Sequence, residues 1–144
     1  EYVRTRPMGK PFAIKGKGGG GIPFYTKPTL KLEKGKRSLH LFILGVDEGK
    51  NVVYNRLGRE DRQGVGVIHF KRSICDEIYF GQLTAETRIV KHQKGFPKYE
   101  WHNIATDKRN EALDTYIYAL GALRIMNIDL DEIYAKHIVK IKNE

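Results

Sequence analysis

The stretch RNEALDTYIYAL, residues 109–120, predicts a helix that carries one acidic side chain on a largely apolar surface. Leu113, Ile117 and Leu120 recur at the three- and four-residue spacing that places side chains on one face of a helix. Asp114 lies within this run. A buried carboxylate costs several kcal/mol unless it is paired, neutralised or bound to a metal ion. Asp114 therefore requires a compensating partner.

Two interpretations of Asp114 follow. As a structural residue, it would pair with Arg109, with Lys108 or with a group on a neighbouring strand. As a functional residue, it would bind Mg²⁺ or Mn²⁺, which take oxygen ligands from one or two carboxylates together with substrate phosphates. Two such ions about 4 Å apart can activate water and stabilise the leaving oxygen in phosphodiester cleavage.

Further polar side chains are candidates for the same site. Asn110 shares a helix face with Asp114, and Glu111 lies within one turn of it. The two-ion chemistry needs additional carboxylates from other parts of the chain. These candidates are Glu86, Asp47 and Glu48.

Hydrophobic patterning around this helix predicts an α/β domain. A continuous apolar run over 38–46 is typical of a strand covered on both faces, and an amphipathic helix follows with Asp47 as its cap and Gly58 at its end. Two segments of alternating polarity flank a turn at 94–97 and predict a hairpin. The other predicted elements are a buried strand over 65–70, a short helix over 75–86, the long helix over about 108–126 with Thr106 or Asp107 as cap, and a short helix over about 131–135 before a basic tail.

The formal charge of +9 is concentrated at the start of the chain. Residues 1–37 hold ten Lys and Arg against two acids, whereas residues 38–144 are nearly neutral. We therefore divide the chain into a basic, glycine-rich leader (1–37) with one short strand and a following domain (38–144). Such a leader suits a polyanion, most simply nucleic acid, or else forms a solvated charged arm. The candidate phosphate contacts are Lys10, Lys15, Lys17, Lys27, Lys31, Lys34, Lys36 and Arg37.

A run of glycines over 16–21 follows the short apolar segment 11–14. Three of these glycines match the dinucleotide-binding pattern G-x-G-x-x-G, but that pattern must open into a helix. Here Ile22-Pro23 follows, so the match is discarded. The run remains a flexible loop that either contacts phosphates or links two strands.

Several classes of protein are disfavoured by composition. Cys75 is the single cysteine and the histidines lack metal-binding spacing, so neither a disulfide nor a zinc site is expected. No apolar stretch approaches the roughly 20 residues of a membrane span. Because the sequence begins at Glu1 without a methionine, we expect it to be a piece of a longer protein.

Three segments carry a resemblance to a known family. The segments YFGQLTAE, KYEWHN and above all KRNEALDTYIYALGALR resemble the C-terminal end of the large terminase subunit of lambda-like tailed phages, the GpA type. The resemblance is good over about residues 64–126, and FAIKGKGG and LGVDEGKNVVYNRL resemble the family less specifically.

The resemblance implies part of an RNase-H-like, metal-dependent nuclease domain, with a central mixed sheet flanked by helices, that cuts concatemeric viral DNA during packaging. Asp114 matches the family's late metal-binding Asp, with Glu111 and Glu86 as further catalytic candidates and Asn110 and Arg109 as supporting groups. The implied cofactors are Mg²⁺ or Mn²⁺, with ATP confined to a motor domain outside this chain. The implied partners are double-stranded DNA, the small terminase subunit and the portal, in the cytoplasm of a bacterial host.

One departure from the family pattern bears on activity. Family members carry further metal-binding acids on an earlier strand and upstream of the IKG segment, and neither pattern occurs here. We therefore expect this chain alone to lack a complete metal site. The alternatives are a non-catalytic nucleic-acid-binding α/β module, in which Asp114 is structural, and an assembly module that docks on the small terminase subunit or the portal.

Overall fold

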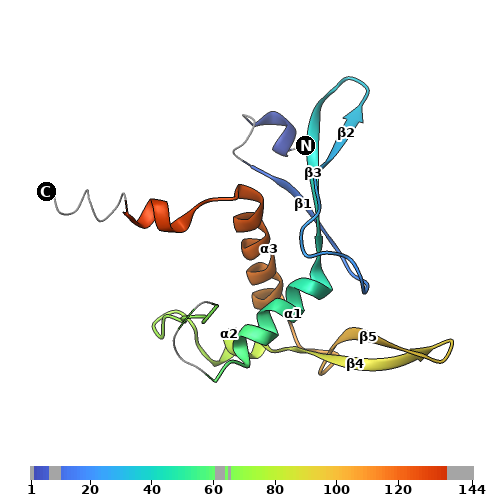
Figure 1. The fold of residues 1–144 in the computed structure, drawn as a ribbon, viewed down its shortest axis with the longest axis vertical. Coiled ribbons are helices and arrows are strands. Elements are labelled where there is room, and N and C mark those ends of the chain that lie inside the picture. Colours follow the sequence, from blue (N-terminus) through green and yellow to red (C-terminus); the bar gives the residue numbers. More distant parts are fainter. Residues whose placement is uncertain (1, 7–10, 61–63, 65, 136–144) are drawn as a thin grey trace, which may run out of the picture.

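The structure, a computed structural model, describes residues 2–6, 11–60, 64 and 66–135 (Figure 1). Three sequence-based predictions fall wholly or partly outside these residues, namely the phosphate contact of Lys10, the first residue of the strand expected over 65–70, and the basic tail. No helix in the described part of the chain is long and apolar enough to cross a membrane.

A three-stranded mixed sheet forms the first part of the molecule. It consists of β1 (Ala13–Lys17), β2 (Thr29–Glu33) and β3 (Lys36–Gly45), in the order β1-β3-β2. β1 runs parallel to β3 and β2 runs antiparallel to it, and the short 3-10 helix η1 (Tyr2–Thr5) contacts β3. The basic leader therefore contributes two of the three strands of this sheet.

The second part contains three helices and a hairpin. The helices are α1 (Val46–Leu57), α2 (Glu77–Leu83) and α3 (Glu111–Met126), and the hairpin pairs β4 (Glu86–Gln93) with β5 (Phe96–Asn103) in antiparallel register. Figure 1 shows the helices gathered at the end of the sheet where β3 runs into α1, with the hairpin extending away from them. This arrangement confirms an α/β domain with a mixed sheet and flanking helices.

The hydrophobic core lies where the three helices meet. α3 supplies Leu113 and Ile117, both fully buried, which confirms the apolar face predicted for this helix. Val53 of α1 and Leu83 of α2 pack with them. α3 also crosses close to β3, because Gly121 leaves room for the buried side chain of Leu44. The core thus fixes α3 against both α1 and the end of β3.

The strand predicted over 38–46 corresponds to β3, but its predicted coverage on both faces is wrong for most of its length. Only its last two residues, Leu44 and Gly45, are buried. The helices reach the sheet at this end, so the first half of the strand stays exposed (Figure 1).

Two predicted helix caps are also wrong. The N-cap position of α1 is Gly45, two residues before Asp47, and the Asp47 carboxylate instead accepts a hydrogen bond from the backbone N–H of Gly19 at 3.1 Å. α3 begins at Glu111, after Asn110, rather than near residue 108, so neither Thr106 nor Asp107 caps it.

The strand expected over 65–70 is absent from its described part, residues 66–70. Gly64 and Gly66 adopt positive φ angles of 104° and 90°, which interrupt extended backbone at the start of the segment. The hairpin is confirmed, although its turn is shorter than predicted because β5 already begins at Phe96. The helix expected over about 75–86 is present as α2, with Asp76 as its cap, but it ends at Leu83, so Glu86 begins β4 instead of ending the helix. Residues 130–135 are helical as expected.

Candidate active site

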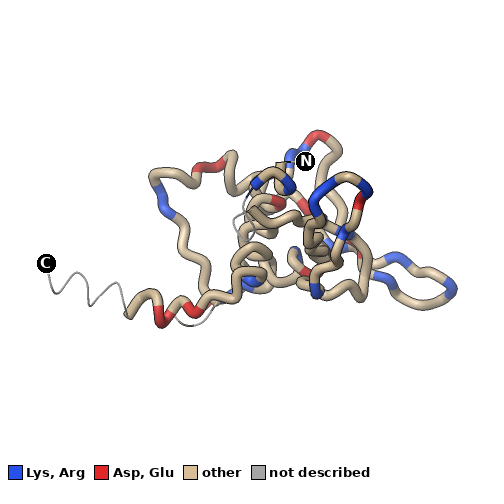
Figure 2. The backbone as a smooth tube through the Cα atoms, turned by 90° about the horizontal axis from the view of Figure 1, so that it is seen from above, with Lys and Arg blue, Asp and Glu red and all other residues tan. Residues whose placement is uncertain are grey.

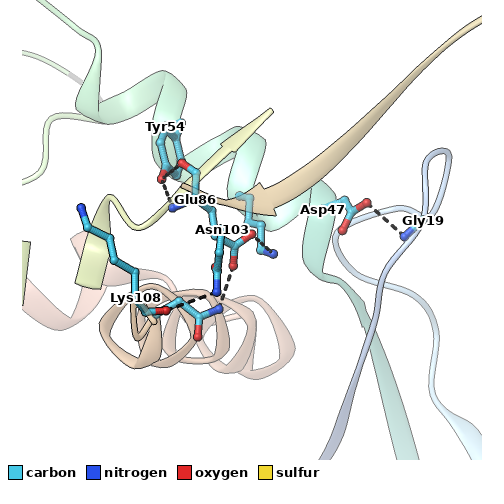
Figure 3. Close-up of polar contacts among 8 residues, drawn as sticks. Gly19, Asp47, Tyr54, Glu86, Asn103 and Lys108 are labelled. Atoms are coloured by element: carbon cyan, nitrogen blue, oxygen red, sulfur yellow. Dashed lines mark hydrogen bonds and ion pairs between the residues drawn. The ribbon is translucent and has the colours of Figure 1, made fainter. Parts of the chain in front are cut away.

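Glu86 is a buried charged residue at the junction of the hairpin with the helices. It is the first residue of β4 and only 4% exposed. One of its carboxylate oxygens, Oε2, lies 2.5 Å from the ammonium of Lys50 on α1. The other, Oε1, accepts a hydrogen bond of 2.7 Å from the side-chain amide of Asn110, next to α3 (Figure 3). The carboxylate is therefore held from two sides by different elements.

The backbone of Glu86 is held as well. The Tyr54 hydroxyl donates a hydrogen bond to the carbonyl of Glu86 and accepts one of 3.3 Å from its N–H (Figure 3). Tyr54 follows Lys50 by four residues on α1, so both side chains project from one helix face. Burial raises the pKa of the Tyr54 hydroxyl, and the nearby charge of Glu86 adds to the rise while the hydrogen bond to its backbone opposes it. Tyr54 therefore stays a neutral donor at physiological pH.

Asp114 lies on the first turns of α3 and is half-buried. Burial raises the pKa of its carboxyl group above the ordinary value of 3.8, the charges of Glu86 and Glu111 raise it further, and the ammonium of Lys50 lowers it. No side chain in the described part of the chain donates a hydrogen bond to this carboxylate. Asp114, Glu86, Glu111 and Lys50 thus form one electrostatic cluster, which we call the carboxylate cluster.

The other predicted site residues of α3 have separate partners. Asn110, predicted to support Asp114, contacts Glu86 instead. Arg109 forms an ion pair of 3.0 Å with Glu111, and both side chains are exposed. Lys108 accepts a hydrogen bond from Asn103 through its carbonyl, while its ammonium points away from Glu86 in Figure 3. Among the described contacts, Arg109 and Lys108 thus have partners other than Asp114, so two of the three partners offered by the structural interpretation are engaged elsewhere.

The candidates Asp47 and Glu48 are engaged elsewhere. Figure 3 shows the Asp47 carboxylate turned toward Gly19 of the glycine-rich loop. Glu48 accepts a hydrogen bond of 3.0 Å from the side-chain amide of Asn51, on the same helix. Both residues lie on the first turn of α1, and neither contacts the Glu86 carboxylate in this structure.

The carboxylate cluster fits one side of a divalent cation site. Glu86 and Asp114 offer the oxygen donors that Mg²⁺ and Mn²⁺ prefer. The ammonium of Lys50 lies 2.5 Å from the Glu86 carboxylate, and its charge lowers the pKa of Asp114. Within the described residues, however, no group of three or more His, Cys, Asp or Glu side chains is arranged to hold a metal ion. The cluster therefore supplies part of a ligand set.

Lys50 and Tyr54 were missed by the sequence analysis. Their spacing on α1 is a weak signal that the two side chains share a face, but the sequence does not indicate what that face meets. The partner, Glu86, lies 36 residues beyond Lys50.

The described residues among the predicted phosphate contacts are all exposed. Within this set, Lys36 pairs with Glu33 at 2.6 Å, and the guanidinium of Arg37 donates to the carbonyl of Arg6. Figure 2 also shows basic residues along the extended hairpin, which the sequence analysis did not single out. Those of β4 and β5 and the turn between them are Arg88, Lys91, Lys94 and Lys98.

The fold and the cluster define an α/β domain with a buried acidic site where a hairpin meets two helices. Residues 1–136 match the family described as the terminase large subunit gpA, endonuclease domain. The chain belongs to this family, as the resemblance of the RNEALD segment predicted.

Two relatives support this assignment. The chain is 34% identical over 131 residues to the terminase large subunit of Escherichia phage lambda, and 30% identical over 132 residues to that of Enterobacteria phage P21. Each match covers 86% of this chain but only 20% of the relative, so the chain spans about a fifth of their length. No solved structure matches the chain significantly.

Proposed function

We propose that this chain is part of a metal-dependent endonuclease domain of a phage large terminase subunit, with an RNase-H-like fold, that cuts concatemeric viral DNA during packaging. The observation that supports the proposal is that the start of α3 meets Glu86: Asn110 donates a hydrogen bond to the Glu86 carboxylate, and the charge of Glu86 contributes to the raised pKa of Asp114. Family membership supports the nuclease role.

In this proposal Asp114 and Glu86 would hold Mg²⁺ or Mn²⁺, which when bound would supply activation of water and charge stabilisation for cleavage of a DNA phosphodiester. The remaining residues keep the ligands in place. Asn110 and Tyr54 orient Glu86 through its side chain and its backbone. Glu111 adds negative charge to the cluster, and Arg109 holds Glu111 at its exposed edge. Further ligands come from outside the described residues.

The exposed basic residues of the sheet are proposed to contact the backbone of double-stranded DNA. The packaging role implies that the small terminase subunit and the portal are partners, and that the protein acts in the cytoplasm of the host bacterium. ATP would be used by a motor domain elsewhere in the protein. A non-catalytic nucleic-acid-binding module is the second candidate, favoured by the ion pair that already neutralises Glu86.

The test measures DNA cleavage by the full-length protein that carries this chain. Asp114→Asn keeps the shape of the side chain but removes the charge that holds a divalent ion, so we expect loss of Mg²⁺- or Mn²⁺-dependent cleavage with ATP turnover retained. Asp107→Asn removes an exposed acid outside the cluster and should cleave normally. Normal cleavage by Asp114→Asn would overturn the assignment of Asp114 as a metal ligand.

A further inference from the structure

The hairpin formed by β4 and β5 projects from the rest of the fold. Figure 1 shows it extending away from the helices, and of residues 87–103 only Ile89, Glu100 and Trp101 are not exposed. Two strands of eight residues, at about 3.3 Å per residue, reach roughly 25 Å. A two-stranded hairpin is only marginally stable by itself in water. A projecting hairpin of this length, which we call the hairpin arm (residues 87–102), therefore points to a partner that it contacts.

The hairpin arm is basic along its whole length (Figure 2). Arg88 lies near its base, Lys91 and Lys98 are directly opposite each other on the two strands, and Lys94 lies in the turn. Glu100 is the single acid among residues 87–102. Like charges placed directly opposite on neighbouring strands are destabilising, so this positive charge is kept at the expense of hairpin stability. An excess of positive charge suits a polyanion, because binding to phosphates releases condensed counterions.

Glu100 holds the two opposing lysines together. Its carboxylate pairs with Lys91 at 2.8 Å and with Lys98 at 3.0 Å, and these contacts, with a smaller one from His102, hold its pKa at about 2. Glu100 is therefore ionised at neutral pH. The two lysine side chains are about half exposed, and ion pairs in such surroundings contribute little to stability because water screens them. The ammonium groups can thus exchange the Glu100 carboxylate for a phosphate.

Apolar side chains alternate with the basic ones on the hairpin arm. Val90, Phe96 and Tyr99 are all at least half exposed. The guanidinium of Arg88 lies over the ring of Tyr99, 4.7 Å from its centre, which orients a planar group suited to phosphate oxygens. DNA offers matching chemistry, because its grooves present phosphates at their edges and apolar groups such as the thymine methyl inside.

We propose that the hairpin arm lies in the major groove of double-stranded DNA and holds the duplex beside Glu86, with Arg88 and Lys94 contacting phosphates. The major groove, about 12 Å wide, admits a two-stranded ribbon. Glu86 directly precedes the arm in β4, so a duplex bound along the arm runs toward the candidate site. This inference rests on the proposed function for the identity of the nucleic acid. It adds a DNA-binding surface that is separate from the basic leader.

The first experiment locates the contact by photo-cross-linking. The full-length protein carrying Phe96→p-benzoylphenylalanine, at the start of β5 beside the turn, is irradiated with a labelled DNA duplex in the presence of EDTA. We expect cross-links between this position and the DNA. Tyr134→p-benzoylphenylalanine is the matched control, because Tyr134 is an equally exposed aromatic residue outside the arm, and it should give few cross-links.

The second experiment removes charge from the arm. A variant of the full-length protein with Arg88→Gln and Lys94→Gln should reduce the slope of log affinity against log salt for duplex DNA by about 2 units, because each phosphate contact contributes about one. The control variant, with Lys71→Gln and Arg124→Gln, removes the same charge from exposed positions elsewhere and should change the slope much less. Glu100→Gln should have the opposite effect and make the slope steeper, because it frees two ammonium groups for phosphates.

Two results would overturn the inference. One is cross-linking at position 96 no stronger than at position 134, which would leave a protein as the partner of the arm. The other is an unchanged salt slope in the Arg88 and Lys94 variant. Both measurements are made without divalent ions, so neither depends on cleavage. Normal cleavage by Asp114→Asn together with strong cross-linking at position 96 would remove the proposed metal ligand and support the hairpin arm.

Discussion

Asp114 illustrates how a single side chain can be more costly to a fold than its neighbours. It lies half-buried on α3, and burial, together with two nearby carboxylates, raises its pKa. Glu86 is far more buried, yet it is compensated by an ion pair and a hydrogen bond. The charge of Asp114 is therefore expected to destabilise the metal-free fold, whereas the charge of Glu86 is compensated by its partners.

We expect Asp114→Asn to leave the metal-free melting temperature unchanged or to raise it. The raised pKa means that the folded state disfavours the ionised carboxylate, so the penalty grows as pH rises above the ordinary value of 3.8 and is present at neutral pH. Any increase in stability caused by Asp114→Asn should therefore be largest near pH 7 and should shrink toward about pH 4.5. Thermal melts of the full-length protein and the variant at both pH values measure this.

Mn²⁺ provides the control for that comparison. It should stabilise the unaltered protein through linkage and the Asp114→Asn variant much less. If the metal-free variant instead loses about 1–3 kcal/mol in its free energy of unfolding, Asp114 is a structural residue whose charge is satisfied in the fold.

The members of the carboxylate cluster were predictable to different degrees. The anomaly of an acid in an apolar helix is visible in the sequence, so Asp114 and its neighbour Asn110 were singled out. Glu86 was a weaker candidate, because nothing near it in the chain marks it as buried. Lys50 could not be found in this way, because a lysine near the start of an amphipathic helix normally projects into solvent, and only the approach of β4 buries it.

At the scale of elements, the passage from β3 into α1 depends on Gly45. A side chain at this position would lie 2.3 Å from the carbonyl oxygen of Ile22 and 2.6 Å from that of Pro23. Gly45 also donates its N–H to the carbonyls of Pro23 and Phe24. The segment after the glycine-rich loop is thereby held against the end of the strand.

Gly45→Ala should destabilise the protein by at least about 2 kcal/mol, because backbone atoms cannot move aside as a flexible side chain can. Gly81→Ala is the matched control: Gly81 lies inside α2 with open space around its Cα, so alanine there should be neutral or stabilise by roughly 0.5–1 kcal/mol. Urea unfolding of the two variants measures both changes. Similar stability of Gly45→Ala and the unaltered protein would show that the strand end can shift.

The elements that could be predicted are those with strong local signals. The long apolar run of β3, the stripes of α1 and α3 and the turn between β4 and β5 were all recognised. The segment 66–70 was misassigned, because its apolar residues resemble a buried strand whereas it has no partner strand and follows glycines with positive φ. Asp47 was wrongly predicted as a helix cap, because its side chain makes a tertiary hydrogen bond with Gly19 instead.

At the scale of the whole molecule, the uneven charge predicts how binding to DNA depends on salt. The exposed lysines Lys15, Lys17 and Lys27 all come from the basic leader. If they contact phosphates, changing all three to Gln should reduce the slope of log affinity against log salt by roughly 2–3 units for duplex DNA. Sequence preference should hardly change, because phosphate contacts carry no sequence information.

The matched control removes the same charge from another surface. Lys71, Lys108 and Arg124 are exposed and lie outside the three-stranded sheet, so changing them to Gln should alter the slope much less. Fluorescence anisotropy at several salt concentrations gives both slopes. Equal slopes for the leader variant and the unaltered protein would mean that these lysines are only solvated.

The contacts of Glu86 also determine when this region can assemble. They join β4 to Lys50 and Tyr54, 36 and 32 residues earlier, and to Asn110, 24 residues later. α1 and the hairpin can form while the chain is still being synthesised, but Glu86 acquires its last partner only after residue 110 has left the ribosome. Contacts between such distant residues form slowly because loops must close first. The nascent domain thus carries an incompletely held acidic site until the start of α3 docks against β4.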